Sequence, residues 1–409
     1  MIVFEIIAWL CCFYLVFPFL SGFFAVLGRK ESLEEKPFYA DFACIITVYK
    51  EKDIAWPLVR ALLKQEHPNF RIYLVADGIE EAFEAKVLDE RLSIFQPRSF
   101  LNSKVASIAM ALEKMATRHT HVVIFDPDNL VPPHFLRVID RYHANGFQAV
   151  QGKRIAKNTE GTYAALDALG EYYYDFAVRN VPYLLGSSST IAGSGMSLEI
   201  DLYRKNIAGE MQVLQEKGVV VAEDKSLQLQ LVGQGVRIAY AGAAVLFDEK
   251  ITAAAQIGRQ RGRWLNSFFG QLPASLRLLA KGLTQLDWNR IYFALMVAMP
   301  PMVMLIGISG MVALIALFVN VGYFFLMVGC LFVFGLGFLT LLTFNHTPSE
   351  VLRAIPKIPL FVWGQLSGML HIRKANKDFM ATSHQEISEI EPLWAKRKVE
   401  FRHLENWWK

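Results

Sequence analysis

Residues 121–128 read HVVIFDPD, an apolar run that ends in two aspartates one residue apart. The run up to Phe125 has the length and the β-branched content of a buried strand, so Asp126 and Asp128 follow directly at its carboxyl end. Hard divalent cations such as Mg²⁺ or Mn²⁺ take oxygen ligands, often one or two carboxylates completed by other oxygens. An aspartate pair is also common in turns and helix caps, and its position after a strand is what favours a metal site.

Short apolar runs alternate with helical stretches on both sides of this motif. The sequence predicts strands at Phe42–Tyr49, Arg71–Ala76, Leu92–Phe95, His121–Phe125 and Phe147–Gln151. Helices are predicted between them, at Ile54–Lys64, from the second strand to about Asp89, and at Lys104–Ala116. This alternation is typical of a Rossmann-like α/β fold, with a mostly parallel sheet covered by helices on both faces. Ligands of such sheets bind beyond the carboxyl ends of the strands, so polar residues that follow strands are candidates for a site.

Polar residues do follow the other strands. The first strand ends with Thr47, Tyr49 and Glu51, and Asp77 follows the second. Taken singly, each is more often a loop cap than a ligand. Lys104 stands at the start of a predicted helix, where a helix N-terminus and a cation together favour a phosphate.

Two later motifs contain glycines and acids. The first reads Gly193-Ser194-Gly195-Met196. The second is the pair Glu223 and Asp224, which leads into a predicted helix at 225–231. Acidic residues at a helix start are commonly N-caps. The functional interpretation is that one of these carboxylates acts as a general base on an acceptor hydroxyl.

The last motif reads QRGRW and contains Gln260, Arg263 and Trp264. Arginine supplies a fixed positive charge and a planar fork of donors, which suits a diphosphate. Tryptophan offers an apolar face for a sugar ring. The alternative is a basic stretch beside a membrane with an interfacial tryptophan, which is also common.

Apolar residues gather in residues 1–28 and 291–344, and each stretch is long enough to cross a ~30 Å hydrocarbon core. Arg29 and Lys30 follow the first stretch, which predicts an uncleaved anchor with its N-terminus outside and the next domain in the cytoplasm. The alternative for this stretch is a buried core helix. Asn320 lies near the middle of the second stretch, which predicts a hairpin and three spans in total.

The remaining segments follow from this layout. The sequence predicts an amphipathic helix on the membrane surface at residues 265–290. It predicts an interfacial or re-entrant helix at residues 356–371. Residues 41–264 form the predicted cytoplasmic domain, and residues 372–409 a cytoplasmic tail. The chain is therefore expected to be an integral protein of the cell or inner membrane, in contact with membrane lipid.

Composition excludes two other classes of protein. The net charge of +4 is modest and no dense basic patch is interleaved with aromatics, so nucleic acid is not an expected partner. Basic residues beside the apolar stretches suit anionic lipid instead. The four cysteines fall in predicted membrane helices or in a buried strand, which gives no disulfide framework and no zinc spacing.

In chain order, the motifs resemble those of the family 2 glycosyltransferases, particularly the membrane-integrated synthases of cellulose, chitin and hyaluronan. The resemblance covers residues 42–265 and rests on Asp77, Asp126, Asp128, Asp224, Gln260, Arg263 and Trp264. It implies a GT-A fold, a nucleotide-sugar donor that is usually UDP-linked, and an inverting reaction.

The resemblance also implies roles for single residues. The nucleoside of the donor would be held by Thr47, Tyr49, Glu51 and Asp77. The diphosphate would be held by Lys104, Gln260, Arg263 and Trp264, with Mg²⁺ or Mn²⁺ on Asp126 and Asp128. The catalytic base would be Asp224, with Glu223 beside it. A carbohydrate or glycolipid acceptor would lie against Gly193, Ser194, Gly195, Met196 and Trp264.

The sequence departs from the family pattern in two places. Many relatives carry paired acids where this chain has Ala76 and Asp77, and relatives often carry basic residues at Ser197–Glu199, which leaves the acceptor open. One interpretation is a processive synthase that extends a polysaccharide, for which three spans suggest a partner or an oligomer. The alternative enzyme is a non-processive transferase that glycosylates a lipid such as a ceramide or a polyprenyl phosphate. A catalytically inactive scaffold is a third class, and the complete set of acids argues against it.

Overall fold

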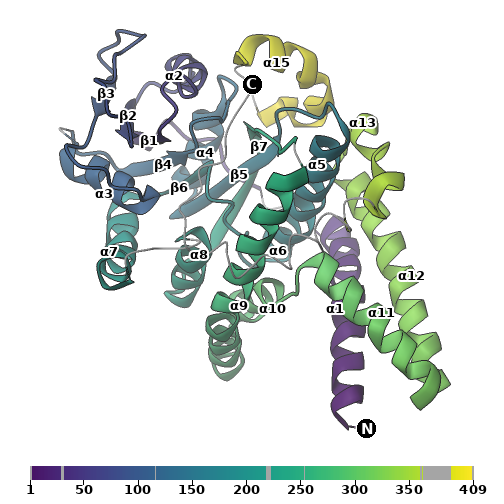
Figure 1. Cartoon of the computed structure of the whole chain (residues 1–409). Coiled ribbons are helices and arrows are strands. Elements are labelled where there is room, and N and C mark those ends of the chain that lie inside the picture. The colour runs from purple at the N-terminus through teal and green to yellow at the C-terminus, as the bar shows by residue number, and fades with distance from the viewer. Residues whose placement is uncertain are drawn as a thin grey trace.

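The structure, a computed structural model, describes residues 2–28, 32–115, 117–217, 223–252, 254–359, 362 and 388–407. One sheet of seven strands organises the part of the chain between the apolar segments (Figure 1). Its strands are β1 (Phe42–Tyr49), β2 (Phe70–Asp77), β3 (Leu92–Phe95), β4 (His121–Phe125), β5 (Ala149–Ala156), β6 (Met196–Glu199) and β7 (Ile238–Asp248).

The strand order is β3-β2-β1-β4-β6-β5-β7. All neighbouring strands are parallel except β6, which runs antiparallel to both β4 and β5. The predicted α/β fold with a mostly parallel sheet is therefore confirmed. Because β1 and β4 are adjacent and parallel, the residues that follow them lie at one edge of the sheet.

Helices cover both faces of the sheet, as the alternation of buried side chains in β1 requires. Phe42, Cys44 and Ile46 belong to one apolar cluster, whereas Ala43 and Ile45 belong to another. The first cluster includes residues of α2 (Trp56–Leu63), α4 (Phe135–Ala144) and α5 (Thr162–Tyr174). The second includes residues of α3 (Lys104–Lys114), α7 (Ile200–Lys217) and α8 (Glu223–Gly233). After α5 the chain continues through a π-helical turn, η1 (Asp175–Asn180), into α6 (Val181–Leu184).

The helix predicted after the second strand does not form. Residues 78–91, all of them described, make an irregular loop instead. Gln96 holds this loop, because its Nε2 donates to the carbonyls of Ile79 (2.9 Å) and Glu81 (2.8 Å) and its Oε1 accepts from the amide of Phe83 (3.0 Å). These bonds from a distant side chain take the place of helical ones.

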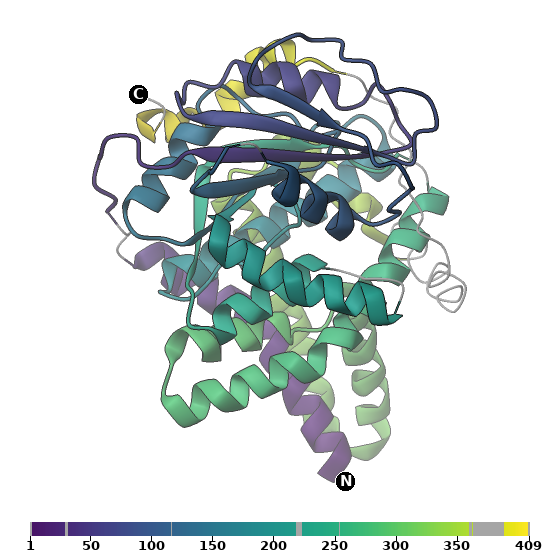
Figure 2. The ribbon, with the colours of Figure 1, turned by 90° about the vertical axis from the view of Figure 1, so that its left-hand side faces the viewer.

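Among the described residues, three helices are long and apolar enough to cross a membrane: α1 (Ile2–Leu27), α11 (Met302–Val319) and α12 (Val321–Phe344). They pack on one another and extend away from the sheet, with the N-terminus at the far end (Figure 2). Asn320 separates α11 from α12, and its side chain accepts from the amide of Gly322 at 2.9 Å.

The predicted hairpin begins later than the apolar stretch does. Residues at its start form a separate helix, α10 (Trp288–Val297), and α11 begins only at Met302. Pro300 and Pro301 lie between the two helices, and prolines interrupt a helix because they lack the amide donor and restrict the residue before them. The preceding helix, α9 (Ala254–Gln285), is continuous and includes the QRGRW motif, which was expected just before a surface helix.

The C-terminal part of the chain returns to the sheet domain. After α12 come α13 (Ser349–Leu352) and η2 (Ile355–Lys357), and most of the predicted segment 356–371 lies outside the described residues. The helices α15 (Ile390–Arg397) and η4 (Lys398–Trp407) then pack beside α2 and β7 (Figure 1). Arg397 is 3% exposed and donates to the carbonyl of Ala156 at the end of β5 (3.0 Å).

Candidate active site

The two aspartates after β4 lie in a tight turn that the end of β7 holds in place. The amide of Asp126 donates to Oδ1 of Asn129 at 2.9 Å, and the amide of Asn129 donates to the carbonyl of Asp126 at 3.1 Å. Asp128 is 5% exposed, and its Oδ2 accepts from the amide of Glu249 at 3.1 Å. Asn129 donates in turn to Oδ1 of Asp248 at 3.2 Å. The carboxylate of Asp126 is thus left at the edge of the sheet, while that of Asp128 is turned toward β7.

Lys104 joins the aspartate turn to the glycine motif. Its Nζ lies 2.5 Å from Oδ1 of Asp126 and 3.0 Å from the carbonyl of Gly193. Ser103 caps the helix that carries it, since its Oγ accepts from the amide of Ala106. Burial by itself would lower the pKa of Lys104, but the carboxylates of Asp126, Glu223 and Asp224 raise it above its ordinary value. The ammonium group therefore stays charged amid three carboxylates.

Asp224 lies against the glycine motif at the start of α8. A Cβ atom added at Gly193 would be 3.5 Å from Oδ2 of Asp224, which is van der Waals contact. The space between Gly193 and this carboxylate is therefore about the size of a methyl group. Nζ of Lys225 is 3.9 Å from the same carboxylate and donates to the carbonyl of Ile191 at 3.3 Å. Burial raises the pKa of Glu223, an effect that Lys104 opposes and the charge of Asp224 reinforces. The acid pair and the aspartate turn, which are about 100 residues apart in the sequence, thus both act on the charge of Lys104.

The glycine motif needs both of its glycines. Gly193 and Gly195 have φ values of +81° and +63°, in the left-handed region that residues with side chains rarely adopt. Ser194 is fully buried, and its Oγ has no hydrogen-bond partner. Met196 begins β6 and pairs with Ile124 of β4. The chain therefore passes directly from the site into the sheet.

Asp77 holds together the other side of the sheet edge. Its Oδ1 accepts from the amides of Gly78 (2.9 Å) and Leu101 (2.8 Å), and its Oδ2 accepts from the amide of Asn102 (2.7 Å). Tyr49 donates from its hydroxyl to Oδ1 of Asn102 at 2.8 Å. Asp77 is 1% exposed, and these contacts hold residues 101–102 at the place where the sequence predicts a nucleoside site. Thr47 and Glu51, which flank Tyr49, are both half-buried.

The QRGRW motif contributes from α9. Oε1 of Gln260 is buried without a hydrogen-bond partner, and Trp264 is 43% exposed. The side chain of Arg263 lies outside the described residues.

The donor set fits a magnesium or manganese ion that is shared with a substrate. Within the described ranges, no cluster of three or more histidine, cysteine, aspartate or glutamate side chains forms a complete metal site. Mg²⁺ does not need one, because it is usually held by one or two carboxylates together with phosphate oxygens and water. Asp126 offers such a carboxylate next to the ammonium group of Lys104, where a diphosphate would also be neutralised.

Several residues around the site were not predicted. Asp248 is the last residue of β7, and Lys250 follows this strand. Glu171 lies in α5 and Arg154 in β5, and the four side chains form ion pairs behind the site. Asp248 carries the same sequence signal as Asp126, an acid directly after an apolar strand that ends in phenylalanine. Glu171 has no such signal.

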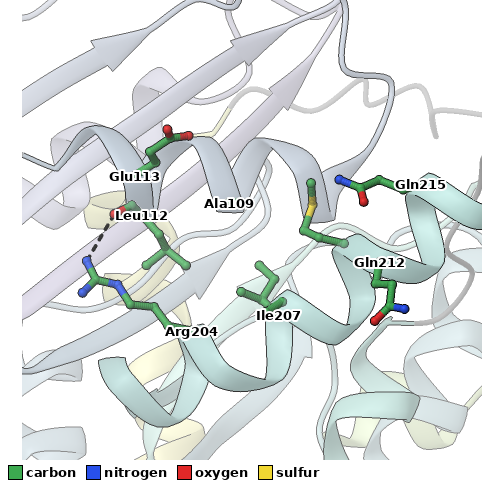
Figure 3. Close-up of a pocket in the computed structure, with 9 residues that line it drawn as sticks. Ala109, Leu112, Glu113, Arg204, Ile207, Gln212 and Gln215 are labelled. Carbon is green, nitrogen blue, oxygen red and sulfur yellow. Dashed lines mark hydrogen bonds between the residues drawn. The ribbon is translucent and has the colours of Figure 1, made fainter.

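A groove elsewhere on the molecule contains none of the predicted residues. It has a volume of about 430 Å³ and lies between α3 and α7, lined by residues such as Leu112, Glu113 and Ile207 (Figure 3). Arg204 crosses its rim and donates to the carbonyl of Leu112 at 3.2 Å (Figure 3).

Comparison with known proteins identifies the family of residues 40–267. The sequence model of a family described as "Glycosyltransferase like family 2" matches residues 40–267. Among curated proteins, none matches the sequence. A solved structure of the mannosyltransferase PcManGT from Pyrobaculum calidifontis, in complex with GDP-Man and Mn²⁺, is 15% identical, with a TM-score of 0.43, over 82% of this chain and 99% of that one. A crystal structure of residues 1–349 of S. aureus TarS is 13% identical, with a TM-score of 0.38, over 82% of this chain and 92% of that one.

Proposed function

Because the chain belongs to the glycosyltransferase like family 2, we propose that it is a membrane-bound, inverting enzyme that transfers a sugar from a nucleotide sugar to a growing polysaccharide. The observation that carries the proposal is the position of Lys104, which joins Asp126 to the carbonyl beside Asp224. This arrangement supports the proposal, because one lysine contacts both a group suited to the diphosphate and the segment that faces a group suited to the acceptor.

The aspartate turn and Lys104 serve the donor. Asp126 and Asp128 would hold Mg²⁺ or Mn²⁺, which neutralises charge on the departing diphosphate when it is bound. Lys104 adds a fixed positive charge, and its ion pair with Asp126 keeps that charge at the sheet edge until the donor arrives. Gln260, Arg263 and Trp264 act on the same diphosphate, and Thr47, Tyr49, Glu51 and Asp77 form the nucleoside side, with a UDP-sugar as the proposed donor.

Asp224 serves the acceptor. It removes the proton from the acceptor hydroxyl, which attacks the anomeric carbon from the face opposite the nucleotide. Gly193 supports this role, because the absence of a side chain leaves room for the acceptor beside the carboxylate. The segment from Ser194 to Met196 continues the acceptor side, and Glu223 shapes the charge around the base.

The membrane helices support a cytoplasmic catalytic domain with the N-terminus outside. The tail forms ion pairs from Glu389 to Arg60 and from Glu391 to Lys64, so the chain has returned to the side of the sheet after α12. Basic residues, among them Arg353 and Lys357, follow α12 on that side, as the positive-inside rule requires.

A lipid acceptor is the second candidate, and the surface of α9 favours it. Phe269, Leu276 and Leu283 recur every seven residues along this helix and are each more than half exposed, at 52%, 51% and 55%. An exposed apolar stripe beside Arg277 and Lys281 suits the surface of a bilayer, where a ceramide or polyprenyl phosphate would be reached from α9.

A donor screen on membranes that contain the protein tests both candidates. UDP-sugars and GDP-sugars are supplied with Mn²⁺ or with a chelator, and nucleotide release is measured. We expect metal-dependent release from a UDP-sugar, and radiolabelled sugar should appear in a long polymer. A single-sugar lipid product would replace the first candidate by the second. Release from none of the donors would contradict the proposed function.

A further inference from the structure

One buried carboxylate behind the site holds three cations. Glu171, in α5, is 7% exposed. Its Oε1 accepts from Arg179 at 2.7 Å, and its Oε2 accepts from Arg154 and from Lys250, both at 3.0 Å. Burial by itself would raise the pKa of Glu171, but Arg154, Lys250 and Arg179 lower it well below its ordinary value. The group is therefore an anion that three cations surround.

The contact with Lys250 leads to the aspartate turn. Nζ of Lys250 also donates to Oδ2 of Asp248 at 2.9 Å. Oδ1 of Asp248 accepts from Asn129, and Oδ1 of Asn129 accepts from the amide of Asp126. Asn129 is fully buried, so this route has little freedom to adjust.

The contact with Arg154 leads to the glycine motif. A second nitrogen of its guanidinium group donates to the carbonyl of Ala192 at 3.0 Å, one residue before Gly193. Gln151 holds the same segment, because it accepts from the amide of Ala192 (3.0 Å) and donates to the carbonyl of Ser194 (3.0 Å). The segment that faces Asp224 is thus fixed from two positions of β5.

The contact with Arg179 anchors the cluster to the membrane part of the chain. Arg179 lies 3.7 Å from Oδ1 of Asp175, and Oδ2 of Asp175 accepts from Asn345 at 3.2 Å. Asn345 follows α12 directly and also accepts from Lys153 at 2.5 Å. Glu171 is therefore held from a third direction.

We propose that Glu171 is a positioning residue for the transfer step: its contacts with Lys250 and Arg154 set the aspartate turn and the glycine motif relative to each other. The inference rests on the proposed function, since the turn serves the donor and the glycine motif the acceptor. Glu171 acts on the turn and on the glycine motif only through Lys250 and Arg154. A displacement of about 1 Å between reacting groups lowers a rate by up to about a hundredfold, so the alignment matters more than the small contacts that maintain it.

The substitution Glu171→Gln tests this role in the full-length protein in detergent. The amide keeps the size of the side chain but presents an NH₂ group and no charge to Lys250 and Arg154. The aspartate turn and the glycine motif are then no longer held by contacts to one shared carboxylate. We expect kcat for nucleotide release to fall at least tenfold, while the KM for the donor stays within about threefold. A residue that only stabilises the fold would lower the melting temperature without changing kcat per folded molecule.

Asp140→Asn is the matched control. Asp140 is a buried carboxylate too, at 3% exposure, and it accepts from the amides of Tyr39 and Ala40 before β1, away from the carboxyl ends of the strands. This variant should lose thermal stability and keep kcat within about twofold. Arg154→Lys is the second test, because it keeps the charge but replaces the two-pronged contact with Glu171 and Ala192; it decides the question if Glu171→Gln does not fold.

The outcomes separate this inference from the proposed function. A folded Glu171→Gln protein with kcat within twofold of the wild type would overturn the inference and leave the function standing, as would a rise in KM alone. The same values for Arg154→Lys would overturn it where Glu171→Gln is not folded. A wild-type protein that turns over no UDP- or GDP-sugar would overturn the proposed function, and this inference with it.

Discussion

Gly193→Ala separates the role of the glycine motif in catalysis from its role in folding. Gly193 has a φ of +81°, and an added Cβ would lie 3.5 Å from Oδ2 of Asp224 and 3.8 Å from its Cγ. Gly186 provides the control, because its φ is +82° and an added Cβ would meet nothing within 4 Å. The two substitutions therefore impose the same backbone strain, and only one of them places a methyl group beside the predicted base.

The size of each effect follows from these contacts. An alanine in the left-handed region costs about 1–2 kcal/mol, so both variants should lose that much stability. For a domain of this size, 1 kcal/mol corresponds to about 2–4 °C in melting temperature, which predicts a fall of about 2–8 °C in each. The contact at 3.5 Å is ordinary van der Waals contact and adds no further loss. The methyl group would occupy the space that we propose for the acceptor. We therefore expect a fall of at least tenfold in kcat/KM, or about 1.4 kcal/mol of transition-state stabilisation.

Thermal unfolding in detergent measures the loss of stability. Nucleotide release, assayed under the same conditions for both variants, measures the loss of kcat/KM. Gly186→Ala should keep the kcat/KM of the wild type at temperatures below its transition. Equal activity in the two variants would refute the reasoning, because it would mean that the acceptor does not pass between residue 193 and Asp224.

Three further predictions follow from other contacts. Lys104→Met should lower kcat by about a hundredfold to a thousandfold, since one electrostatic contact to a developing charge is worth about 2.7–4 kcal/mol. Adding Mn²⁺ should restore little of this loss. Stability should fall by about 2 kcal/mol as the pH falls from 7 to 5. Burial lowers the pKa of His121 from 6.5 to about 4, so in this range the unfolded chain binds a proton that the folded chain does not. His121→Asn should therefore reduce the dependence of the melting temperature on pH. Arg397→Met should destabilise the docked tail by about 3 kcal/mol, because it leaves the buried carbonyl of Ala156 and the carboxylate of Glu400 unpaired. Limited proteolysis, which should then cut the chain before α15, measures this effect.

The sheet and its direction could be predicted because the signals are local. The run that ends at Phe125 is buried at every residue, and the order of strands and helices along the chain requires a parallel sheet with two covered faces. The aspartates after β4 and the acids at the start of α8 were found for the same reason, as each follows a recognisable element. The start of the membrane hairpin at Met302 also had a local signal, the two prolines before it.

Other features depend on contacts between distant residues and left no signal in the pattern. The loop after β2 replaces a predicted helix because Gln96 supplies its hydrogen bonds. Asp77 accepts hydrogen bonds from the amides of residues 101 and 102, 24 and 25 positions away, and these contacts could not be predicted from the strand that it ends. Glu171 lies in a helix among apolar neighbours, and its three cations come from β5, from η1 and from the residues after β7. Nothing in the local sequence around it distinguishes it from a surface acid.

We propose that Asp224 and Asp126 act on the two reactants at one place, with Lys104 between them. The most direct measurement compares Asp224→Asn with the wild type in two assays, sugar transfer and binding of the nucleotide with Mn²⁺. We expect transfer to fall at least about a thousandfold, because a general base contributes up to about ten-thousandfold to a rate. The dissociation constant for the nucleotide should change less than about threefold. Near wild-type transfer by Asp224→Asn, or an equal loss of nucleotide binding, would contradict this proposal.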